Sequence, residues 1–353
     1  MNSNRVLFIT RKYPPMKGGM ESYSYNLISN YDGDYVLKAL GKRQIHLLWF
    51  YPYCLLYVLF NARKFDVIQL GDMLLCGVGW LAKKINQRIK VVATIHGLDI
   101  TYSNPIYQTY LKLFSHNFDV YVPNSSYTQS VAEERGYRPC SMIPPATLNN
   151  NMKDISVCTK KEFCERYGLT EDIFVISTVG RLVKRKGVEW FIYNVLPQLN
   201  HSKLVYLVAG SGEMEGAIQD AIKKTHENRV KLLGRITDQE LADLYAHSDV
   251  FLMPNIYVEN DVEGYGMVAV EAAAAGCLVV AANIQGITDA VKDGVSGILY
   301  KPESVEKLSY LLDDIMENYE NYREITVTAR KHVRAECTGK AVAEKYKNLM
   351  QNV

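Results

Sequence analysis

The sequence lacks the cysteine patterns that indicate disulfide bonds or structural zinc. Its seven cysteines are scattered, odd in number, and include no Cys-x-x-Cys pair. Disulfide frameworks use even numbers of cysteines in secreted chains, and zinc sites need closely spaced ligand pairs. The chain also shows no basic, apolar and small-residue order of a signal peptide before the strand-like run Val6 to Thr10. We therefore expect a protein of the reducing cytoplasm.

Several catalytic and binding motifs are also absent. The chain contains neither His-Glu-x-x-His, Gly-x-Ser-x-Gly nor Gly-x-x-x-x-Gly-Lys-Ser/Thr, so zinc hydrolysis, serine hydrolysis and P-loop chemistry have no anchor. It has no Cys/His finger, no helix-turn-helix signature and no basic motif interleaved with aromatics. Nucleic acid is therefore not an expected partner.

Short apolar runs alternate with helical segments through all 353 residues, and this length favours about two domains. The predicted strands are Val6–Thr10, Val67–Leu70, Val91–Ile95, Val120–Val122, Met142–Ile143, Ile173–Val179, Val205–Ala209, Val230–Leu233, Val250–Met253 and Val279–Ala281. Predicted helix starts include a capping box at Ser126 and Gln129 and another at Thr237 and Glu240. The alternation predicts an α/β protein with two doubly wound, Rossmann-like domains.

The segment Pro144 to Met152 contains two prolines and three asparagines, which disfavour helix and strand and predict an interdomain linker. The expected domains are residues 1–150 and 151–335, followed by a C-terminal helix in 336–353 that can pack back on the first domain. The net charge of +2 divides unevenly between them. Residues 1–150 hold 16 Lys and Arg against 9 Asp and Glu, or +7, so the remaining 203 residues carry −5. A basic first domain can approach anionic lipid head groups or a phosphorylated acceptor.

One apolar segment, Leu47 to Phe60, is uncharged and rich in aromatic residues. It is shorter than the ~20 residues that span a bilayer, and Pro52 interrupts it. A buried element of the first domain is one interpretation. An interfacial segment is the other, favoured by Trp49, the neighbouring tyrosines and the basic residues on both sides.

Two carboxylates eight positions apart belong to the segment Glu263-Gly-Tyr-Gly-Met-Val-Ala-Val-Glu271. The Gly-Tyr-Gly turn opens an apolar, alanine-rich helical run, and the first amides of a helix bind phosphate well. Glu271 faces the same volume as Glu263 only if the helix begins near Gly266. This arrangement suits a polyhydroxylated ligand that carries phosphate. The competing interpretation is a loop glutamate beside a buried helix, with Glu271 paired to a cation.

A basic loop, Arg181-Leu-Val-Lys-Arg-Lys186-Gly187, follows a predicted strand. Open parallel sheets bind ligands at the carboxyl ends of their strands. A guanidinium and an ammonium group at such a position can neutralise a diphosphate, which makes Arg181 and Lys186 candidate ligands. Lys184 and Arg185 fit a solvated basic turn better.

Two glycine loops and one histidine also follow predicted strands. Gly18 and Gly19 can bring the backbone close to phosphate or sugar, but their loop lacks the Gly-x-Gly-x-x-Gly spacing of a dehydrogenase. Gly212 belongs either to a nucleotide-binding loop or to a plain strand-to-helix turn. His96, beside a glycine at a strand end, is either a structural histidine or part of a ligand site.

These segments together resemble retaining GT-B glycosyltransferases, specifically glycosyltransferase family four, also called group 1 glycosyltransferases. The segments in family order are Tyr13–Glu21, His96–Gly97, Gly180–Gly187, Gly210–Glu213, Leu232–Ile236 and Glu263–Gly276. The second half matches from about residue 173 to 300, and the first half mainly at the glycine loop and His96. The resemblance implies two Rossmann-like domains facing across a cleft, with the acceptor on the first, the nucleotide sugar on the second, and neither cofactor nor metal.

The resemblance also implies residue roles. Arg181 and Lys186 would bind the donor diphosphate, Glu263 would orient the donor sugar without acting as a covalent nucleophile, and Glu271 would accept hydrogen bonds from the ribose. His96 would lie near the donor sugar. The other implied donor-binding positions are Gly18, Gly19, Gly212, Arg235, Tyr265, Gly266, Met267 and Val268.

The implied function is transfer of a hexose, with retention, from a nucleotide-diphosphate sugar to an acceptor. That acceptor would be a lipid-linked or polysaccharide precursor in cell-surface glycan synthesis, such as that of lipopolysaccharide. Peripheral contact with an anionic inner membrane surface is expected from the basic first domain and the aromatic segment. A GT-B sugar-nucleotide epimerase and a catalytically silent nucleotide-sugar-binding subunit remain alternatives, and the sequence specifies neither base, sugar, linkage nor oligomeric state.

Overall fold

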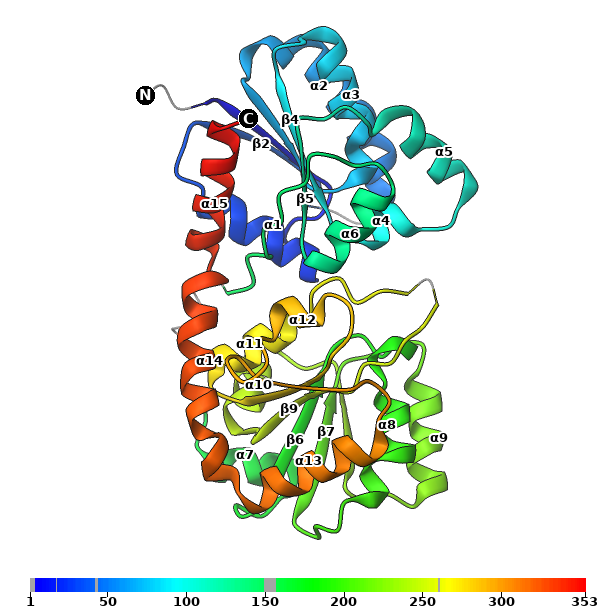
Figure 1. The fold of residues 1–353 in the computed structure, drawn as a ribbon, viewed down its shortest axis with the longest axis vertical. Coiled ribbons are helices and arrows are strands. Elements are labelled where there is room, and N and C mark those ends of the chain that lie inside the picture. The colour runs from blue at the N-terminus through cyan, green and yellow to red at the C-terminus, as the bar shows by residue number, and fades with distance from the viewer. Residues whose placement is uncertain (1–3, 17, 42–43, 149–156, 260) are drawn as a thin grey trace. The chain divides into compact units, whose positions relative to one another are not determined.

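The computed structural model describes residues 4–16, 18–41, 44–148, 157–259 and 261–353, and the chain divides into two units that each contain a parallel sheet (Figure 1). The first unit contains Met1–Asn149 together with Glu336–Val353, and the second contains Asn150–Ala335. The chain therefore leaves the first unit once and returns to it through its last helix.

The first unit contains a five-stranded parallel sheet in the order β2-β1-β3-β4-β5. Its strands are β1 (Val6–Thr10), β2 (Tyr35–Ala39), β3 (Val67–Leu70), β4 (Lys90–Ile95) and β5 (Val120–Pro123). Its helices are α1 (Gly19–Ser29), α2 (Leu47–Asn61), α3 (Cys76–Ile85), α4 (Leu98–Thr101), α5 (Pro105–Phe114), α6 (Ser126–Glu134) and α15 (Gly339–Gln351). Helices cover both faces of the sheet, which explains why all five residues of β1 are buried (Figure 1).

Alternate residues of β1 enter two different hydrophobic cores, because successive side chains of a strand point to opposite faces. Leu7 and Ile9 belong to the core that contains residues of α2 and α3. Val6 and Phe8 belong to the core that contains residues of α1 and α15, including the fully buried Tyr346. The last helix of the chain is thus an integral part of the first unit.

The second unit contains a six-stranded parallel sheet in the order β11-β10-β9-β6-β7-β8. Its strands are β6 (Phe174–Val179), β7 (Leu204–Ala209), β8 (Val230–Gly234), β9 (Val250–Met253), β10 (Leu278–Ala282) and β11 (Ile298–Tyr300). Its helices are α7 (Lys160–Tyr167), α8 (Val188–Asn194), α9 (Glu215–Thr225), α10 (Asp238–His247), α11 (Met267–Ala275), α12 (Ile287–Ala290), α13 (Val305–Glu317) and α14 (Arg323–Glu336). The strand order reverses between β6 and β9, and such a switch point is where open α/β sheets bind ligands.

Most of the predicted strands are confirmed, with bounds that agree to within one residue. Met142–Ile143 is the wrong prediction, because these residues form no strand. The Ile143 amide does donate to the carbonyl of Pro123, at 3.2 Å. The two prolines that follow have no N–H group, so the ladder beside β5 cannot continue.

The two predicted helix caps have different outcomes. The capping box of Thr237 and Glu240 is confirmed, with the Glu240 amide 3.2 Å from Thr237 Oγ1 and the Thr237 amide 2.7 Å from Glu240 Oε2. The cap at Ser126 is wrong, because α6 begins one residue earlier than predicted. Ser125 is its N-cap residue, and Ser125 Oγ accepts from the Thr128 amide at 3.1 Å.

The predicted linker, residues 144–152, is described only as far as Leu148, and its remainder lies outside the described residues. Up to that point the backbone forms no helix or extended strand. The amides of Thr147 and Leu148 donate to the carbonyl of Cys337, at 3.1 and 3.0 Å. These bonds hold the end of the first segment beside the start of α15.

The apolar segment forms α2, a 15-residue helix that contains Pro52. Phe50, Cys54 and Val58 are buried in the core, whereas Trp49 is 79% exposed. Both interpretations of the segment therefore describe part of it, because one face is buried and the other is not. Among the described residues, no helix is long and apolar enough to cross a membrane.

Candidate functional site

The loops at the carboxyl edge of the second sheet are linked to one another by hydrogen bonds, from the loop after β8 to the loop after β10. The links are Arg235 Nε to Ser211 Oγ at 2.8 Å, Leu182 N to Ser211 O at 3.0 Å, Ile256 N to Arg185 O at 3.0 Å and Gly286 N to Glu263 O at 3.2 Å. We call these connected loops the carboxyl rim. Ten of the residues predicted from the sequence lie on this rim or on α11, the helix that follows its β9 loop. Those on the rim are Arg181, Lys186, Gly212, Arg235, Glu263, Tyr265 and Gly266, and those on α11 are Met267, Val268 and Glu271.

An ion pair crosses the switch point of this sheet. Lys186, in the loop after β6, has its Nζ 2.6 Å from Oε2 of Glu263, in the loop after β9. Both side chains are about nine-tenths buried. Asn255 Nδ2 donates to the same carboxylate oxygen at 3.2 Å, and the Glu263 amide donates to Gln285 Oε1 at 2.7 Å. The structure therefore joins two predicted site residues that lie 77 positions apart in the sequence.

The charge state of Glu263 follows from this environment. Burial opposes ionisation and by itself would raise the pKa of the carboxyl group. The positive charges of Lys186 and Arg185 and the hydrogen bonds from Lys186 and Asn255 outweigh burial, so the pKa of Glu263 lies below its ordinary value. Glu263 is thus a carboxylate near neutral pH, which suits it to accept hydrogen bonds and not to donate a proton.

Arg185 is not a residue of a solvated basic turn, and that prediction is wrong. Its side chain is only 9% exposed, and its Nη1 donates to both carboxylate oxygens of Asp261, at 2.8 and 3.1 Å. Its Nε lies 3.5 Å from Glu263 Oε2. The short 3-10 helix Lys184–Lys186 turns Arg185 and Lys186 inward, whereas Lys184 is exposed as predicted.

Arg181 differs from its neighbours on the rim. It is exposed, and its guanidinium has no hydrogen-bond or ion-pair partner among the residues that the structure describes. Arg235 is also exposed, and its hydrogen bond to Ser211 Oγ leaves its two terminal nitrogens available. The rim thus presents arginine donors that an anionic ligand can engage.

Glycines allow the rim loops to pack closely. A Cβ atom at Gly212 would lie 2.3 Å from the carbonyl oxygen of Leu182, and one at Gly187 would lie 1.8 Å from that of Pro254. Gly187 also has a φ of 66°, which favours glycine. The loop after β7 therefore needs Gly212 to approach the loop after β6. This packing requirement exists beside any role in binding a nucleotide.

Helix α11 begins at Met267 with Gly266 as its N-cap residue, which is the start that the placement of Glu271 required. Glu271 Oε2 accepts a hydrogen bond from the hydroxyl of Tyr245 at 3.0 Å. Burial raises the pKa of Glu271 to about 7, although the bond from Tyr245 opposes the shift. The competing interpretation, in which Glu271 pairs with a cation, has no support among the described residues. Tyr265 is buried, whereas Met267 and Val268 are partly exposed.

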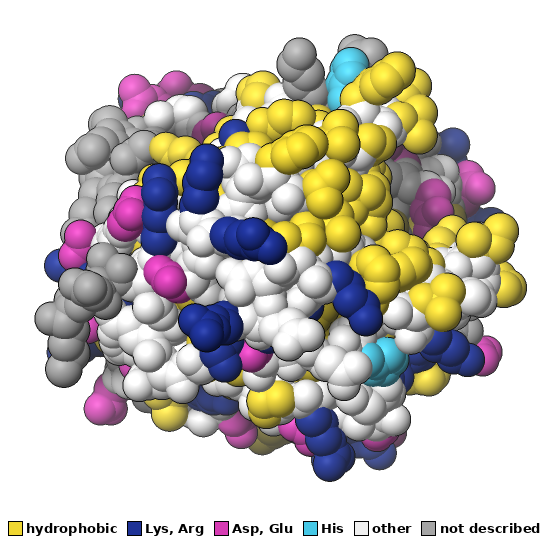
Figure 2. All heavy atoms as spheres, turned by 90° about the horizontal axis from the view of Figure 1, so that it is seen from above, with side chains coloured by type: hydrophobic (Ala, Val, Ile, Leu, Met, Phe, Trp, Pro, Cys, Tyr) yellow, Lys and Arg dark blue, Asp and Glu magenta, His cyan; other side chains and the backbone are white. Residues whose placement is uncertain are grey.

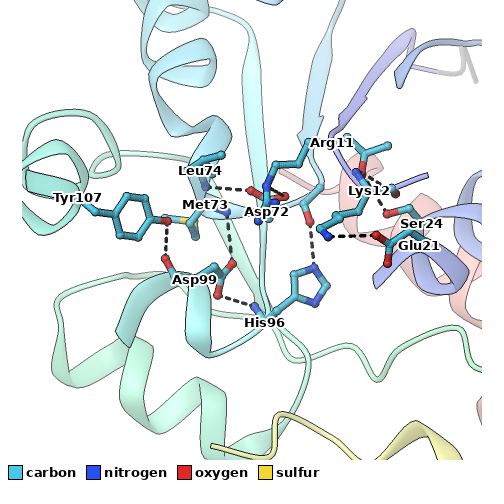
Figure 3. Close-up of polar contacts among 12 residues, drawn as sticks. Arg11, Lys12, Glu21, Ser24, Asp72, Met73, Leu74, His96, Asp99 and Tyr107 are labelled. Carbon is cyan, nitrogen blue, oxygen red and sulfur yellow. Dashed lines mark hydrogen bonds and ion pairs between the residues drawn. The ribbon is translucent and has the colours of Figure 1, made fainter. Parts of the chain in front are cut away.

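His96 lies in the first unit, at the carboxyl end of β4, in a network of polar contacts (Figure 3). Its Nε2 lies 2.9 Å from the carbonyl oxygen of Gly71 and therefore donates to it, since a carbonyl only accepts. Asp99 Oδ1 accepts from the His96 amide at 2.9 Å, and Asp99 Oδ2 accepts from the Met73 amide at 3.3 Å. These bonds fix the ring and join the loops after β3 and β4.

The switch point of the first sheet lies between β1 and β3, and an ion pair crosses it too (Figure 3). Arg11 Nε is 2.9 Å from Oδ2 of Asp72, whose side chain is completely buried. Beside it, Lys12 Nζ is 3.1 Å from Glu21 Oε1 at the start of α1. A Cβ atom at Gly18 would lie 2.5 Å from Glu21 Oε2, so Gly18 gives room to this carboxylate.

Gly19 is the first residue of α1. The helix has 11 residues, and its first N–H groups are of the kind that favours a negative charge. Glu21 supplies such a charge within the first turn. A phosphate near Gly19 would therefore meet a carboxylate as well as the helix terminus, and the donor-binding role of Gly18 and Gly19 stays a prediction.

Sequence reasoning missed several residues that hold the site together. Asn255 and Gln285 bond to Glu263, Tyr245 bonds to Glu271, and Asp261 pairs with Arg185. None belongs to a motif, but Asn255 comes two residues after the predicted strand that ends at Met253, and this position was a usable signal. Among the described residues, no group of three or more His, Cys, Asp and Glu side chains could hold a metal ion.

Comparison with protein families defines the class of this protein. Residues 159–332 match the family described as Glycosyl transferases group 1, and residues 4–147 match the family described as Glycosyltransferase Family 4. The chain belongs to the GT-B glycosyltransferases of group 1.

The sequence identity between this chain and individual relatives is low. The chain is 26% identical to the GDP-mannose-dependent monoacylated alpha-(1-6)-phosphatidylinositol monomannoside mannosyltransferase of Corynebacterium glutamicum, over 99% of this chain and 98% of the relative. It is 23% identical to a GDP-mannose-dependent alpha-(1-6)-phosphatidylinositol monomannoside mannosyltransferase of Mycobacterium tuberculosis, over the same shares. Among solved structures, Anabaena HepE in complex with UDP has a TM-score of 0.77 and 19% identity, over 99% of this chain and 100% of HepE. The likeness to HepE shows the fold.

Proposed function

We propose that the protein transfers a hexose from a nucleotide-diphosphate sugar, with retention and without a metal ion, to a lipid-linked or polysaccharide-precursor acceptor. The observation that carries this proposal is the carboxyl rim of the second unit. There an exposed arginine, Arg181, lies in the same loop as Lys186, which is paired with the sugar-binding candidate Glu263. Membership of the glycosyltransferase family supports the reaction class.

The proposed roles follow from charge. The departing nucleotide diphosphate gains negative charge as the glycosidic bond to the sugar breaks, and preorganised cations stabilise that charge. Arg181 offers an uncommitted guanidinium fork, and Lys186 offers an ammonium group that Glu263 holds in place. When Lys186 turns toward the diphosphate, Arg185 keeps a positive charge beside Glu263. The basic residues thus take the place of a divalent cation in this proposal.

Glu263 serves in this proposal as an acceptor for the hydroxyl groups of the donor sugar. Its lowered pKa keeps it ionised, and its Oε2 is already engaged by Lys186 and Asn255. Such a carboxylate is suited to orient a sugar and poorly suited to attack its anomeric carbon. Retention would then arise from attack by the acceptor on the face from which the nucleotide departs.

The acceptor proposal draws on the relatives. Two proteins that align with 99% of this chain are named as mannosyltransferases that act on phosphatidylinositol mannosides. A glycolipid acceptor and GDP-mannose as donor are therefore the first pair to test. The identities of 26% and 23% make both a proposal for this chain.

The decisive test measures thermal unfolding of the purified protein with UDP-, GDP- and ADP-sugars. A ligand that binds only the folded state at about 100 times its Kd stabilises the protein by about 2.7 kcal/mol. We expect one base to raise Tm and the Arg181→Ala variant to lose most of that increase. If no nucleotide sugar in the panel raises Tm, the donor assignment is wrong.

The stabilising donor is then incubated with and without a membrane-lipid extract as acceptor source. We expect transfer only with acceptor, an anomeric configuration in the product that matches the donor, and unchanged activity after treatment with EDTA. Conversion of the donor without acceptor would favour an epimerase. Binding without any turnover would favour a catalytically silent subunit.

A further inference from the structure

Helix α2 presents an apolar face to solvent on the side opposite its buried residues. Phe50, Cys54 and Val58 recur at every fourth position and enter the core. The opposite side carries large apolar residues at the same helical spacing. The exposed face, with exposed fractions, consists of Leu48 (74%), Trp49 (79%), Tyr53 (47%), Leu56 (56%), Leu59 (46%) and Phe60 (76%), and Ile45 (71%) precedes it. We call these seven residues the α2 face.

The α2 face is unlike an ordinary surface helix, in which the solvent side is polar. No residue from Leu47 to Asn61 carries a charge. Figure 2 shows hydrophobic side chains gathered over one side of this surface of the molecule, with Lys and Arg side chains beside them. A contiguous apolar area of this kind with a polar rim marks a binding surface.

Cations lie beside the α2 face at Lys38 and at the C-terminal end of the helix. Lys38 lies over the ring of Tyr57 at 4.0 Å and over the ring of Tyr53 at 5.6 Å. Arg63 and Lys64 follow directly after the helix and are both exposed. The side chain of Lys64 reaches back to Asn61 Oδ1 at 2.9 Å, which places its ammonium group at the end of the helix.

These features together favour one occupant over the others. A second copy of the chain would bring two positively charged rims together, which disfavours self-association through this face. A partner protein would have to match a helix face that offers almost no hydrogen-bonding group. An anionic bilayer surface suits all the components, because apolar side chains enter the acyl boundary, Trp and Tyr prefer the interface, and Lys and Arg meet lipid phosphates.

We propose that the α2 face is a docking surface for a bilayer that contains anionic phospholipids. The helix would lie in the interfacial plane, since its 15 residues are too few to span the hydrocarbon core. Trp49 and Phe60, the two most exposed residues of the face, enter the membrane, while Arg63 and Lys64 bind head-group phosphates. This inference deepens the proposed function and rests on it, because the lipid-linked acceptor belongs to that proposal. Docking brings the enzyme to the membrane surface where such an acceptor resides.

The test measures sedimentation of the purified full-length protein with vesicles, without donor or acceptor, so it can fail independently of the proposed function. The vesicles contain either phosphatidylcholine alone or phosphatidylcholine with phosphatidylglycerol in a ratio of about 7 to 3, at low salt. The double variant Trp49→Asn/Phe60→Asn is compared with Tyr310→Asn. Tyr310 is an equally exposed aromatic residue, at 78%, on α13 of the second unit.

We expect the wild-type protein and Tyr310→Asn to bind the anionic vesicles equally. The double variant should bind roughly tenfold more weakly or worse. The separate variant Arg63→Ala/Lys64→Ala should lose about fivefold for each cation removed, and only with the anionic vesicles. Circular dichroism and urea unfolding confirm that each variant is folded, which is expected because the changed side chains are exposed.

Two outcomes would overturn the proposal. One is equal binding of the wild-type protein and the Trp49→Asn/Phe60→Asn variant, or no binding of the wild-type protein to either vesicle. The other is a wild-type dimer in light scattering that the same double variant converts to a monomer while vesicles bind neither form. That second outcome would assign the α2 face to a second copy of the chain.

Discussion

The two units place a cation and a carboxylate in the same topological position, but they leave different charges exposed. In the first unit, Arg11 after β1 pairs with Asp72 after β3, and in the second, Lys186 after β6 pairs with Glu263 after β9. Each pair crosses the switch point of its own sheet. The second unit has in addition an exposed arginine, Arg181, without a partner among the described residues.

Under the proposed function, this difference separates a structural use of the switch point in the first unit from a ligand-binding use in the second. Asp72 is completely buried, and the neighbouring cation Lys12 is paired with Glu21. The described polar groups of the first unit's switch point thus bond mainly to one another. At the second switch point the positively charged groups outnumber the carboxylates. An anionic ligand can neutralise this excess of positive charge. The comparison leads to four predictions.

The largest effect is expected from Lys186→Ala. Loss of this cation removes charge stabilisation from the leaving group and should lower kcat of the transferase reaction by roughly 100- to 1000-fold. The matched control is Lys184→Ala, because Lys184 belongs to the same short 3-10 helix and is exposed. Steady-state kinetics with the stabilising donor provides the measurement. Equal loss in both variants would mean that Lys186 has no special role.

The next effect is on stability and concerns the first unit. Arg11→Met leaves the fully buried Asp72 without its cation, and breaking such a pair costs about 3 kcal/mol or more. Urea unfolding measures the loss. In the control Arg5→Met, the broken pair with Asp34 is about half exposed and contributes at most about 1 kcal/mol. Similar unfolding free energies for the two variants would contradict the structural role of the Arg11 pair.

A smaller effect, now on binding, is expected from Arg181→Ala. A hydrogen bond to a charged group contributes about 1.5 to 3 kcal/mol, so donor affinity should fall by roughly 10- to 100-fold. Stability without ligand should not change, because the side chain is exposed. Isothermal titration with the donor measures the affinity, and Arg181→Lys should recover only part of it, since lysine lacks the planar fork. A variant with normal affinity and reduced stability would reverse the roles assigned to the two units.

The fourth prediction concerns the pH dependence that Glu271 contributes to stability. Its pKa rises from 4.5 when the chain is unfolded to about 7 in the folded protein. The folded state therefore holds this proton more tightly, and the stabilisation is complete below about pH 4.5 and is lost as pH rises through 7. Glu271→Gln should flatten the fall in unfolding free energy between these values, and Tyr245→Phe should steepen it by removing a bond that favours the carboxylate. Unchanged curves for Glu271→Gln would show that Glu271 is ionised like an ordinary surface glutamate.

The fold could be predicted largely from the sequence, because buried parallel strands appear as short β-branched runs between helical segments. Two local predictions, the cap of α6 and the strand at residues 142–143, failed because one or two residues decide where such an element begins or ends. Ser125 and Ser126 are chemically identical as caps, and only the start of α6 distinguishes them. A hydrogen-bond pattern beside β5 runs from Pro139 to Ile143, but the prolines that follow Ile143 prevent its extension.

The candidate site was predictable where residues follow strands, and unpredictable where the answer depends on which loops are neighbours. Lys186 and Glu263 were identified separately, but their contact depends on β6 lying beside β9. Arg185 was misassigned for the same reason, since Asp261 comes from a loop 76 residues away. The sequence also could not show which face of α2 is buried and which is exposed. Both faces of the helix are apolar, and no period in the sequence distinguishes them.

The return of the chain to the first unit has a consequence for biosynthesis. The core beside α1 contains Val342, Ala343, Tyr346 and Met350 of α15, which a ribosome makes after the whole of the second unit. Domains usually fold in the order of their synthesis. Here the second unit has all its residues while the first unit still lacks α15, which completes one of its two cores. The unit that emerges first is therefore the one that finishes folding last.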